Sequence, residues 1–165
     1  DSGMAIGGLA VGEEKNAMFE TIHLMDSLLP KDQPRYLMGV GRPTDLVKSV
    51  QSGIDMFDCV LPTRNARNGQ LFTSKGIINI GNKIHKESFQ KLDPDCVCYT
   101  CKHFSRSYLR HLFNIKEVLG LRLATIHNLT YYMTLMETIR KNIKSECFSS
   151  WSNAYLSEMA DHKGM

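Results

Sequence analysis

One carboxylate stands in an otherwise apolar stretch that is followed by two arginines. Residues 56–61 form a mostly apolar run that Pro62 ends, which is the pattern of a buried strand, and Asp58 is its charged member. A buried carboxylate is unfavourable unless it is paired, hydrogen-bonded or at the open end of the strand. Arg64 and Arg67 follow in a loop rich in Asn and Gly, an arrangement that suits chemistry on a phosphorylated polymer. The alternative is a structural Asp that caps a turn beside two solvated arginines.

A second group of residues has the chemistry of a metal site. Cys96, Cys98 and Cys101 form a C-x-C-x-x-C cluster shortly after Pro94. Thiolates are soft ligands, and three so close in sequence can share one ion, so we expect a structural zinc with four ligands. An iron–sulfur cluster and unligated thiols are the alternatives. Because no secretory signal is visible, metal ligation is favoured over a disulfide framework.

The spacing of the sequence does not determine the fourth zinc ligand. His103, His111, His127 and Cys147 are the candidates. His103 lies too close to the last cysteine of the cluster to fold back without strain, and His127 is well placed if the helix that follows packs against the cysteines. Spacing leaves the choice among the last three candidates open. Cys59 and Cys147 fit packed thiols better than ligands.

Alternating strands and helices are expected to position the carboxylate. Hydrophobic patterning predicts strands over 3–10, 35–41 and 56–61. Helices are expected between them, one from Glu13 or Glu14 to Pro30 and one from Pro43 to Gly53. This order predicts a parallel sheet covered by helices.

The carboxyl ends of parallel strands lie at one edge of a sheet, where ligand sites form. The loops after Gly7, Gly39 and Asp58 are therefore expected to meet there. Glycines in such loops let the backbone approach a ligand closely. Three strands cannot close a barrel, so we expect the rest of the sheet to lie outside this sequence or in a partner chain.

The pattern changes after Gly69. Two short apolar runs flank residues 74–76 and predict a β-hairpin. Helices are expected over about 106–118 and about 122–145. Trp151 and Tyr155 are four residues apart and suggest one more docked helix.

Composition limits the function classes. The net charge is only +3, but residues 61–91 carry six Lys and Arg against one acid, and residues 102–122 carry five against one. This local surplus favours a polyanion, although a solvated basic face is the alternative. No apolar run approaches the roughly 20 residues that span a bilayer, and no signal peptide is visible. The chain does not begin with Met, so we expect a fragment of a longer polypeptide.

Four motifs, taken together, resemble the queuine tRNA-ribosyltransferase family, and in particular its bacterial tRNA-guanine transglycosylases. They are residues 7–13, 36–41, 55–69, and the cysteine cluster with His127. The similarity runs over essentially the whole chain. It implies an α/β fold, the C-terminal portion of a (β/α)8 TIM barrel with about three βα strands, a zinc-binding subdomain and C-terminal helices. The implied division is 1–69 for the barrel units, 70–145 for the zinc-binding subdomain and 146–165 for a closing helix.

The resemblance implies a reaction. Asp58 would attack C1′ of the guanosine at the anticodon wobble position of tRNA, guanine would leave, and the precursor preQ1 would attack the same carbon. Two displacements retain configuration. The substrate would be a tRNA with a GUN anticodon. The family's second catalytic aspartate has no counterpart in this chain, so the chain alone is expected to lack full activity.

The resemblance also assigns site residues. The implied substrate-binding residues are Gly7, Gly8, Leu9, Ala10, Glu13, Tyr36 and Met38. The implied RNA-binding residues are Gly39, Val40, Gly41, Arg42, Pro43, Thr44, Asp45, Thr63, Arg64, Asn65, Ala66 and Arg67. The implied ligands of one structural Zn²⁺ are Cys96, Cys98, Cys101 and His127.

The resemblance further implies a cytoplasmic homodimer that has no membrane partner. A non-catalytic, zinc-containing RNA-binding fragment or subunit is the alternative function. A non-catalytic paralogue would be expected to lose the motif around Asp58, and this chain retains it.

Overall fold

A computed structural model of the chain describes residues 3–9, 12 and 14–161. The chain forms two compact units, residues 1–60 with 142–156 and residues 61–141 with 157–165. The division at 69/70 and 145/146 that the sequence analysis expects stays a prediction. Among the described residues, no helix has both the length and the apolar character needed to cross a membrane.

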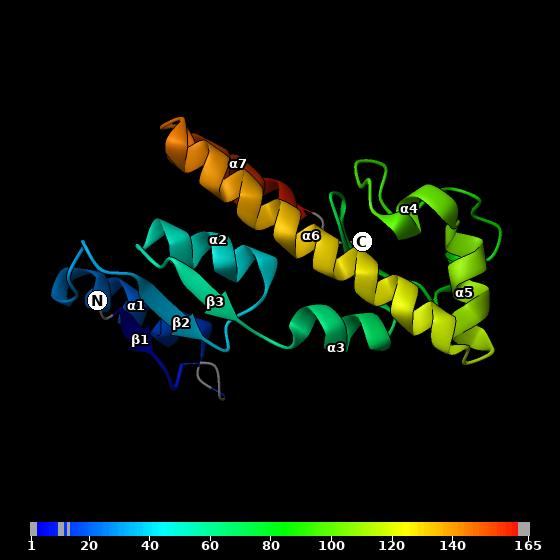
Figure 1. Ribbon diagram of the computed structural model, residues 1–165, viewed down its shortest axis with the longest axis horizontal. Coiled ribbons are helices and arrows are strands. Elements are labelled where there is room, and N and C mark those ends of the chain that lie inside the picture. The colour runs from blue at the N-terminus through cyan, green and yellow to red at the C-terminus, as the bar shows by residue number, and fades with distance from the viewer. Residues whose placement is uncertain (1–2, 10–11, 13, 162–165) are drawn as a thin grey trace. The chain divides into compact units, whose positions relative to one another are not determined.

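The first unit contains a three-stranded parallel sheet in the order β1-β2-β3 (Figure 1). The strands are β1 (Met4–Ile6), β2 (Arg35–Met38) and β3 (Met56–Asp58), and the connections contain α1 (Lys15–Leu28) and α2 (Pro43–Gln51). The predicted parallel βα order is therefore confirmed. Ile6 pairs with Leu37, and Met38 pairs with Asp58, so the three strands end at the same edge of the sheet.

An apolar core holds α1 against this sheet. Met18 and Ile22, four residues apart on one face of α1, are both buried. They belong to one cluster with Ile6 and Leu37 of the strands. The helix therefore covers the sheet through the periodicity that predicted it. At the other end of the unit, Gln51 Nε2 of α2 donates to Ser152 Oγ at 2.9 Å.

The strand that carries Asp58 is shorter and more exposed than the sequence predicts. β3 ends at Asp58, Met56 is 54% exposed, and the expected buried strand over 56–61 is wrong in both length and burial. A helix, α3 (Leu61–Arg67), follows in place of the expected loop. Pro62 lies in its first turn, where a fixed φ and a missing N–H are tolerated. Gly69 has φ +76° just after the helix.

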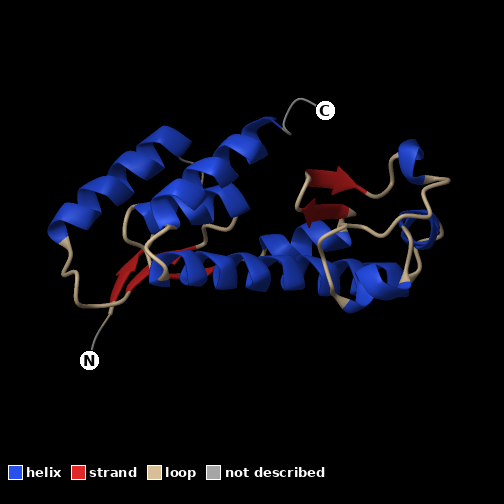
Figure 2. Ribbon diagram, turned by 90° about the horizontal axis from the view of Figure 1, so that it is seen from above, coloured by secondary structure: helices blue, strands red, loops and turns tan. Residues whose placement is uncertain are grey.

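The second unit combines a hairpin with helices (Figure 2). The hairpin strands β4 (Gln70–Thr73) and β5 (Gly76–Asn79) are antiparallel, as predicted. They are followed by the short 3₁₀ helix η1 (Lys83–His85), α4 (Tyr99–His103) and α5 (Arg106–Asn114). The core cluster of this unit includes Ala66, Leu71, Ile80, Leu92, Leu109, Leu112, Leu123 and Ala124.

Two long helices complete the chain. The helix α6 (Val118–Lys144) begins four residues earlier than expected, and α5 ends four residues earlier. Gly120 explains the close turn, because a Cβ there would lie 3.0 Å from Leu112 Cβ. The last helix, α7 (Phe148–Asp161), confirms the element expected around Trp151 and Tyr155, whose stacked rings have centroids 5.4 Å apart.

Candidate functional site

The site is built from the carboxyl ends of the three parallel strands. Gly7 and Gly8 follow β1 directly, and a Cβ on Gly7 would lie 3.3 Å from Met38 Sδ at the end of β2. The glycine loop therefore lies beside the neighbouring strand end, as predicted. Gly8 has φ +82° and open space where a Cβ would stand, so its backbone is accessible to a ligand.

Asp58, the last residue of β3, is held by one donor on the neighbouring strand β2 and one donor just after it. Tyr36 Oη donates to Asp58 Oδ1 at 2.6 Å, and the Gly39 N–H donates to the same oxygen at 3.2 Å. The Asp58 side chain is exposed, so its carboxylate is accessible from solvent.

These donors keep the carboxylate charged. The Tyr36 hydroxyl, and after it the Gly39 N–H, hold the pKa of Asp58 below its usual range. The same hydrogen bond raises the pKa of Tyr36, because the charge of Asp58 disfavours a phenolate beside it. Asp58 is therefore ionised at neutral pH, which is the form that a nucleophilic carboxylate needs.

The sequence analysis named Tyr36 as a substrate-binding residue and did not predict its hydrogen bond to Asp58. The alternation of side chains along the strand could have indicated this hydrogen bond. Residues two apart share one face of a strand, so Tyr36 shares a face with Met38, and Met38 pairs with Asp58. The pairing register, which the sequence does not fix, is needed to use that signal.

The other predicted substrate-binding residues are partly described. Met38 is exposed at the strand end and Leu9 is half-buried. Ala10 and Glu13 lie outside the described residues. The pocket roles assigned to these four residues stay predictions.

The predicted RNA-binding loop over 39–45 contains both exposed and buried side chains. Arg42 is exposed, whereas Val40 packs in the core cluster of the first unit. Asp45 is only 7% exposed, and Lys15 Nζ lies 2.8 Å from both of its carboxylate oxygens. Arg42 is therefore the charged side chain of this loop that is best placed to reach a phosphate.

The second predicted RNA-binding segment is the helix α3. Arg64 and Arg67 are exposed on it, and Ala66 is completely buried in the core of the second unit. Asn65 Nδ2 donates to Gln70 Oε1 at 2.6 Å. One face of the helix is thus fixed in the core while its arginines remain accessible.

The metal centre is formed by Cys96, Cys98, Cys101 and His127, whose ligand atoms all lie within 4.8 Å of one another. His127 Nδ1 is 3.3 Å from Cys101 Sγ and 3.7 Å from Cys98 Sγ. Three sulfurs and one imidazole nitrogen in such a cluster are a fitting donor set for a structural Zn²⁺. These four residues can hold one ion.

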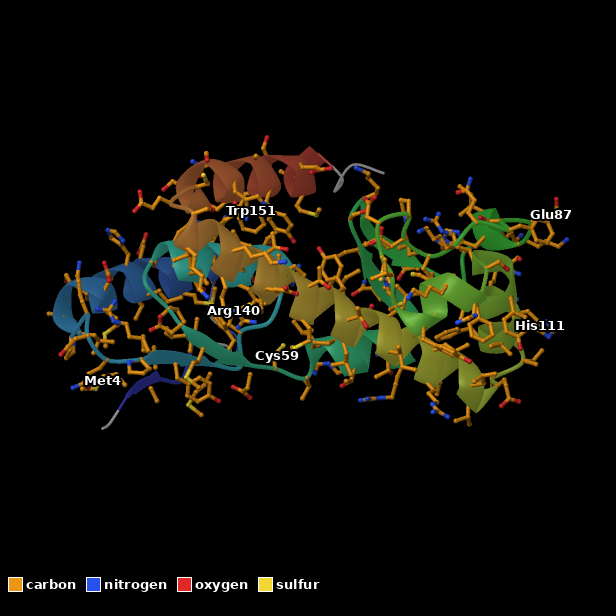
Figure 3. All side chains as sticks on the ribbon, turned by 45° about the horizontal axis from the view of Figure 1, so that its top comes forward. Met4, Cys59, Glu87, His111, Arg140 and Trp151 are labelled. Atoms are coloured by element: carbon orange, nitrogen blue, oxygen red, sulfur yellow. The ribbon has the colours of Figure 1, made fainter. Side chains whose placement is uncertain are left out.

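The cluster selects His127 among the fourth ligands that spacing left open. His111 lies on α5 (Figure 3), and its side chain is exposed. Cys147 is also exposed. Neither residue belongs to the cluster, and neither does His103 or Cys59.

The second nitrogen of His127 is fixed by the backbone. His127 Nε2 lies 2.7 Å from the Phe72 carbonyl oxygen, to which it donates when Nδ1 faces the thiols. Burial lowers the pKa of His127, but hydrogen bonds with Cys96, Cys98 and the Phe72 carbonyl raise it to about 9. A bound zinc would take the place of that proton, since metal ligands must be deprotonated.

Comparison with known proteins gives consistent matches. A family model described as Queuine tRNA-ribosyltransferase matches residues 1–161. A queuine tRNA-ribosyltransferase of Buchnera aphidicola subsp. Acyrthosiphon pisum (strain 5A) is 56% identical over 150 residues, which are 91% of this chain and 40% of that protein. One of Francisella tularensis subsp. tularensis (strain WY96-3418) is 54% identical over 154 residues, which are 93% of this chain and 42% of that protein. The chain thus spans about two fifths of the length of these curated relatives.

Proposed function

Because this chain belongs to the queuine tRNA-ribosyltransferase family, we propose that it supplies the nucleophile of a tRNA-guanine transglycosylase, which exchanges the wobble guanine of tRNA for preQ1. The observation that carries the proposal is Asp58. It is an exposed, ionised carboxylate at the carboxyl edge of a parallel sheet, and the glycine loop after β1 lies at the same edge. Ligand sites of α/β folds form at this edge.

The proposed reaction has two displacements at C1′ of the ribose. An Asp58 carboxylate oxygen forms a bond to C1′ while the bond from C1′ to N9 of guanine breaks. Guanine leaves with the electron pair and takes up a proton. The ring nitrogen of preQ1 then attacks C1′, loses its proton, and releases Asp58 as a carboxylate. Two inversions give net retention.

The tRNA must present its wobble nucleotide unstacked, because C1′ is not accessible to Asp58 in a stacked loop. Arg42, Arg64 and Arg67 are exposed and fit contacts to the phosphates and bases of a single-stranded anticodon loop. The open backbone of Gly8 fits a hydrogen bond to the purine carbonyl, and Leu9 with Ala10 would contact the 7-substituent.

We infer that the three strands belong to a (β/α)8 barrel, since the family implies one and the sheet is parallel with helical connections. The four-ligand metal centre leaves no position for a substrate, so its zinc would be structural. With tRNA as substrate, we place the reaction in the cytoplasm.

We also infer a homodimer, as the family resemblance implies.

The test of the proposed function is covalent capture of tRNA. The chain is fused behind the N-terminal part of the Buchnera aphidicola relative, so that the residues it does not span are supplied. Incubation with tRNA should give an adduct that survives denaturation, and preQ1 should release it faster than queuine does. Asp58→Asn should abolish the adduct, because an amide is a far weaker nucleophile.

Asp32→Asn is the matched control, since Asp32 is an exposed carboxylate in the same unit as Asp58. This variant should form the adduct normally. Adduct formation by the Asp58→Asn enzyme would contradict the assignment of the nucleophile. Binding of tRNA without any adduct in the unaltered fusion would favour the non-catalytic RNA-binding alternative.

A further inference from the structure

A buried carboxamide next to the metal centre holds three backbone groups that are distant in sequence. Asn128 directly follows His127 on α6 and is 0% exposed. Its Oδ1 accepts from the Phe72 N–H at 3.1 Å, and its Nδ2 donates to the carbonyl oxygens of Pro62 at 2.9 Å and Gln70 at 3.1 Å. Both N–H groups of the amide and its oxygen are therefore used.

Of the two carbonyl groups bound by Asn128, one lies at the start of α3 and the other lies just beyond its end. Pro62 is in the first turn of the helix, and Gln70 begins β4 just after the helix ends. A single side chain thus fixes where α3 begins and where the chain leaves it. Ala66, in the middle of the helix, is buried in the core, so the exposed side of α3 has little freedom to shift.

The position of Asn128 is itself determined by its neighbour. The peptide groups of Phe72 are held on both sides, since the Phe72 N–H donates to Asn128 and the Phe72 carbonyl accepts from His127 Nε2 at 2.7 Å. The other nitrogen of His127 faces the thiols of the metal centre. One turn of α6 therefore joins the metal centre, β4 and α3.

The chemistry requires a carboxamide at this position. An aspartate would place a second acceptor against two carbonyl oxygens, and an alanine would remove the side-chain partner of all three backbone groups. An apolar side chain would fill the space but bind none of them. The residue is thus selected for its hydrogen bonds as well as its volume.

We propose that Asn128 is a positioning residue for tRNA recognition, which fixes α3 so that Arg64 and Arg67 meet the anticodon loop in one orientation. This inference rests on the proposed function, because it takes α3 as an RNA-binding element. Because His127 and Asn128 are neighbours on α6, the metal centre would also help to position α3 for tRNA recognition. The hydrogen bonds of the Asn128 side chain go to backbone groups of residues 62, 70 and 72.

The test uses the fusion enzyme described above with Asn128→Asp and Asn128→Ala. Asn128→Asp keeps the shape and the acceptor for Phe72 but removes the donors to the carbonyls of Pro62 in α3 and Gln70 in β4. We expect the KM for tRNA to rise by roughly tenfold or more, as the loss of one to two buried hydrogen bonds implies. The KM for preQ1 and the zinc content should remain unchanged. Asn114→Ala, at an exposed position of α5, is the matched control.

A double-mutant cycle separates positioning from general structure. If Asn128 acts through α3, Arg64→Ala should raise the KM for tRNA by a much smaller factor in the Asn128→Asp enzyme than in the unaltered enzyme. Additive effects, an unchanged KM for tRNA, or loss of zinc or folding in both variants would overturn the inference, because Asn128 would then be an ordinary core residue. If the unaltered fusion forms no adduct, the proposed function fails instead, so the two failures are distinguishable.

Discussion

The lowered pKa of Asp58 is caused most by a single phenol, that of Tyr36. Its carboxylate is exposed, so burial contributes little, and the hydrogen bond from Tyr36 is the largest cause of its lowered pKa. A nucleophile tuned in this way combines access for a large substrate with a charge that persists in mildly acidic solution. Tyr36 is therefore a residue whose removal should change chemistry more than structure.

Tyr36→Phe should raise the pKa of Asp58 towards its usual range. The acid limb of the pH–rate profile of the fusion enzyme should then move to higher pH, because Asp58 becomes protonated sooner as the pH falls. A carboxyl group with a lowered folded-state pKa stabilises the fold above its unfolded pKa and loses that effect as pH falls through the folded pKa. The variant should lose part of this effect, which is small for an exposed group.

Carbon-13 NMR titration of the Asp58 carboxyl carbon measures the change directly. Tyr99→Phe is the control, since Tyr99 is exposed in the other unit and should leave the Asp58 titration unchanged. An Asp58 pKa that is the same in Tyr36→Phe as in the unaltered protein would contradict the role given to this hydroxyl.

Some of these residues could be found from the sequence and others could not. Asp58 and the three cysteines stand out because their types and spacing are unusual in one local stretch. The hydrogen bonds of Tyr36 and Asn128 join residues 22 and up to 66 positions apart. Local sequence patterns carry no information about such pairs until the strand register and the helix packing are known.

At the scale of elements, the sequence predicts helices and strands with periodic apolar residues better than it predicts the boundaries between elements. The two βα units and the hairpin are as expected, because their apolar residues recur at helical or alternating spacing. The sequence analysis took Pro62 as the end of a strand, but proline can also begin a helix, and here it lies in the first turn of α3. Buried Ala66 and the hydrogen bonds of Asn128 favour the helix, and both depend on contacts beyond the local sequence.

The turn between α2 and β3 offers a test of close packing. Gly53 has φ +81°, and a Cβ there would lie 2.6 Å from Arg35 Nη1 and 2.9 Å from Asp26 Oδ1. Arg35 is buried and also donates to the carbonyls of Leu29 and Pro30, where α1 ends. Gly53→Ala should therefore destabilise the first unit by about 1 to 3 kcal/mol, through backbone strain and displacement of this guanidinium.

Urea unfolding followed by tryptophan fluorescence measures this loss. Trp151 is the single tryptophan of the chain and belongs to the same unit as Gly53. Gly81→Ala is the control, because nothing lies within 4 Å of a Cβ at that position, and its unfolding midpoint should change little. If Gly53→Ala and the unaltered chain had the same unfolding midpoint, the hydrogen bonds of Arg35 would have rearranged without a loss of stability.

At the scale of the whole molecule, each unit depends on a different kind of stabilisation. The first has a parallel sheet with an apolar core between the strands and α1. The second combines a two-stranded hairpin with helices, and its core cluster includes Cys98 and Cys101 of the metal centre. A two-stranded hairpin is marginal by itself, so the hydrogen bonds of His127 and Asn128 to β4 contribute to its order.

Removal of zinc should therefore destabilise the second unit and leave the first largely unchanged. Structural zinc sites supply on the order of 10 kcal/mol of binding free energy, which is lost on chelation. Hydrogen exchange followed by mass spectrometry should show a large gain of exchange in peptides from β4, the cysteine cluster and the middle of α6. Peptides from α3 should follow, because Asn128 joins that helix to the turn of α6 that carries His127. Peptides from β1, β2 and β3 should change little.

Two variants separate the effect of the metal from that of the chelator. Cys96→Ser removes a ligand and should reproduce the gain of exchange without any chelator, with less than one zinc per chain. Cys147→Ser removes an exposed thiol outside the cluster and should retain one zinc and the exchange pattern of the unaltered chain. If the gain of hydrogen exchange were equal in both units, the zinc would stabilise the whole chain. If α3 stayed protected from exchange after chelation, the proposed link from the metal centre to Arg64 and Arg67 would be contradicted.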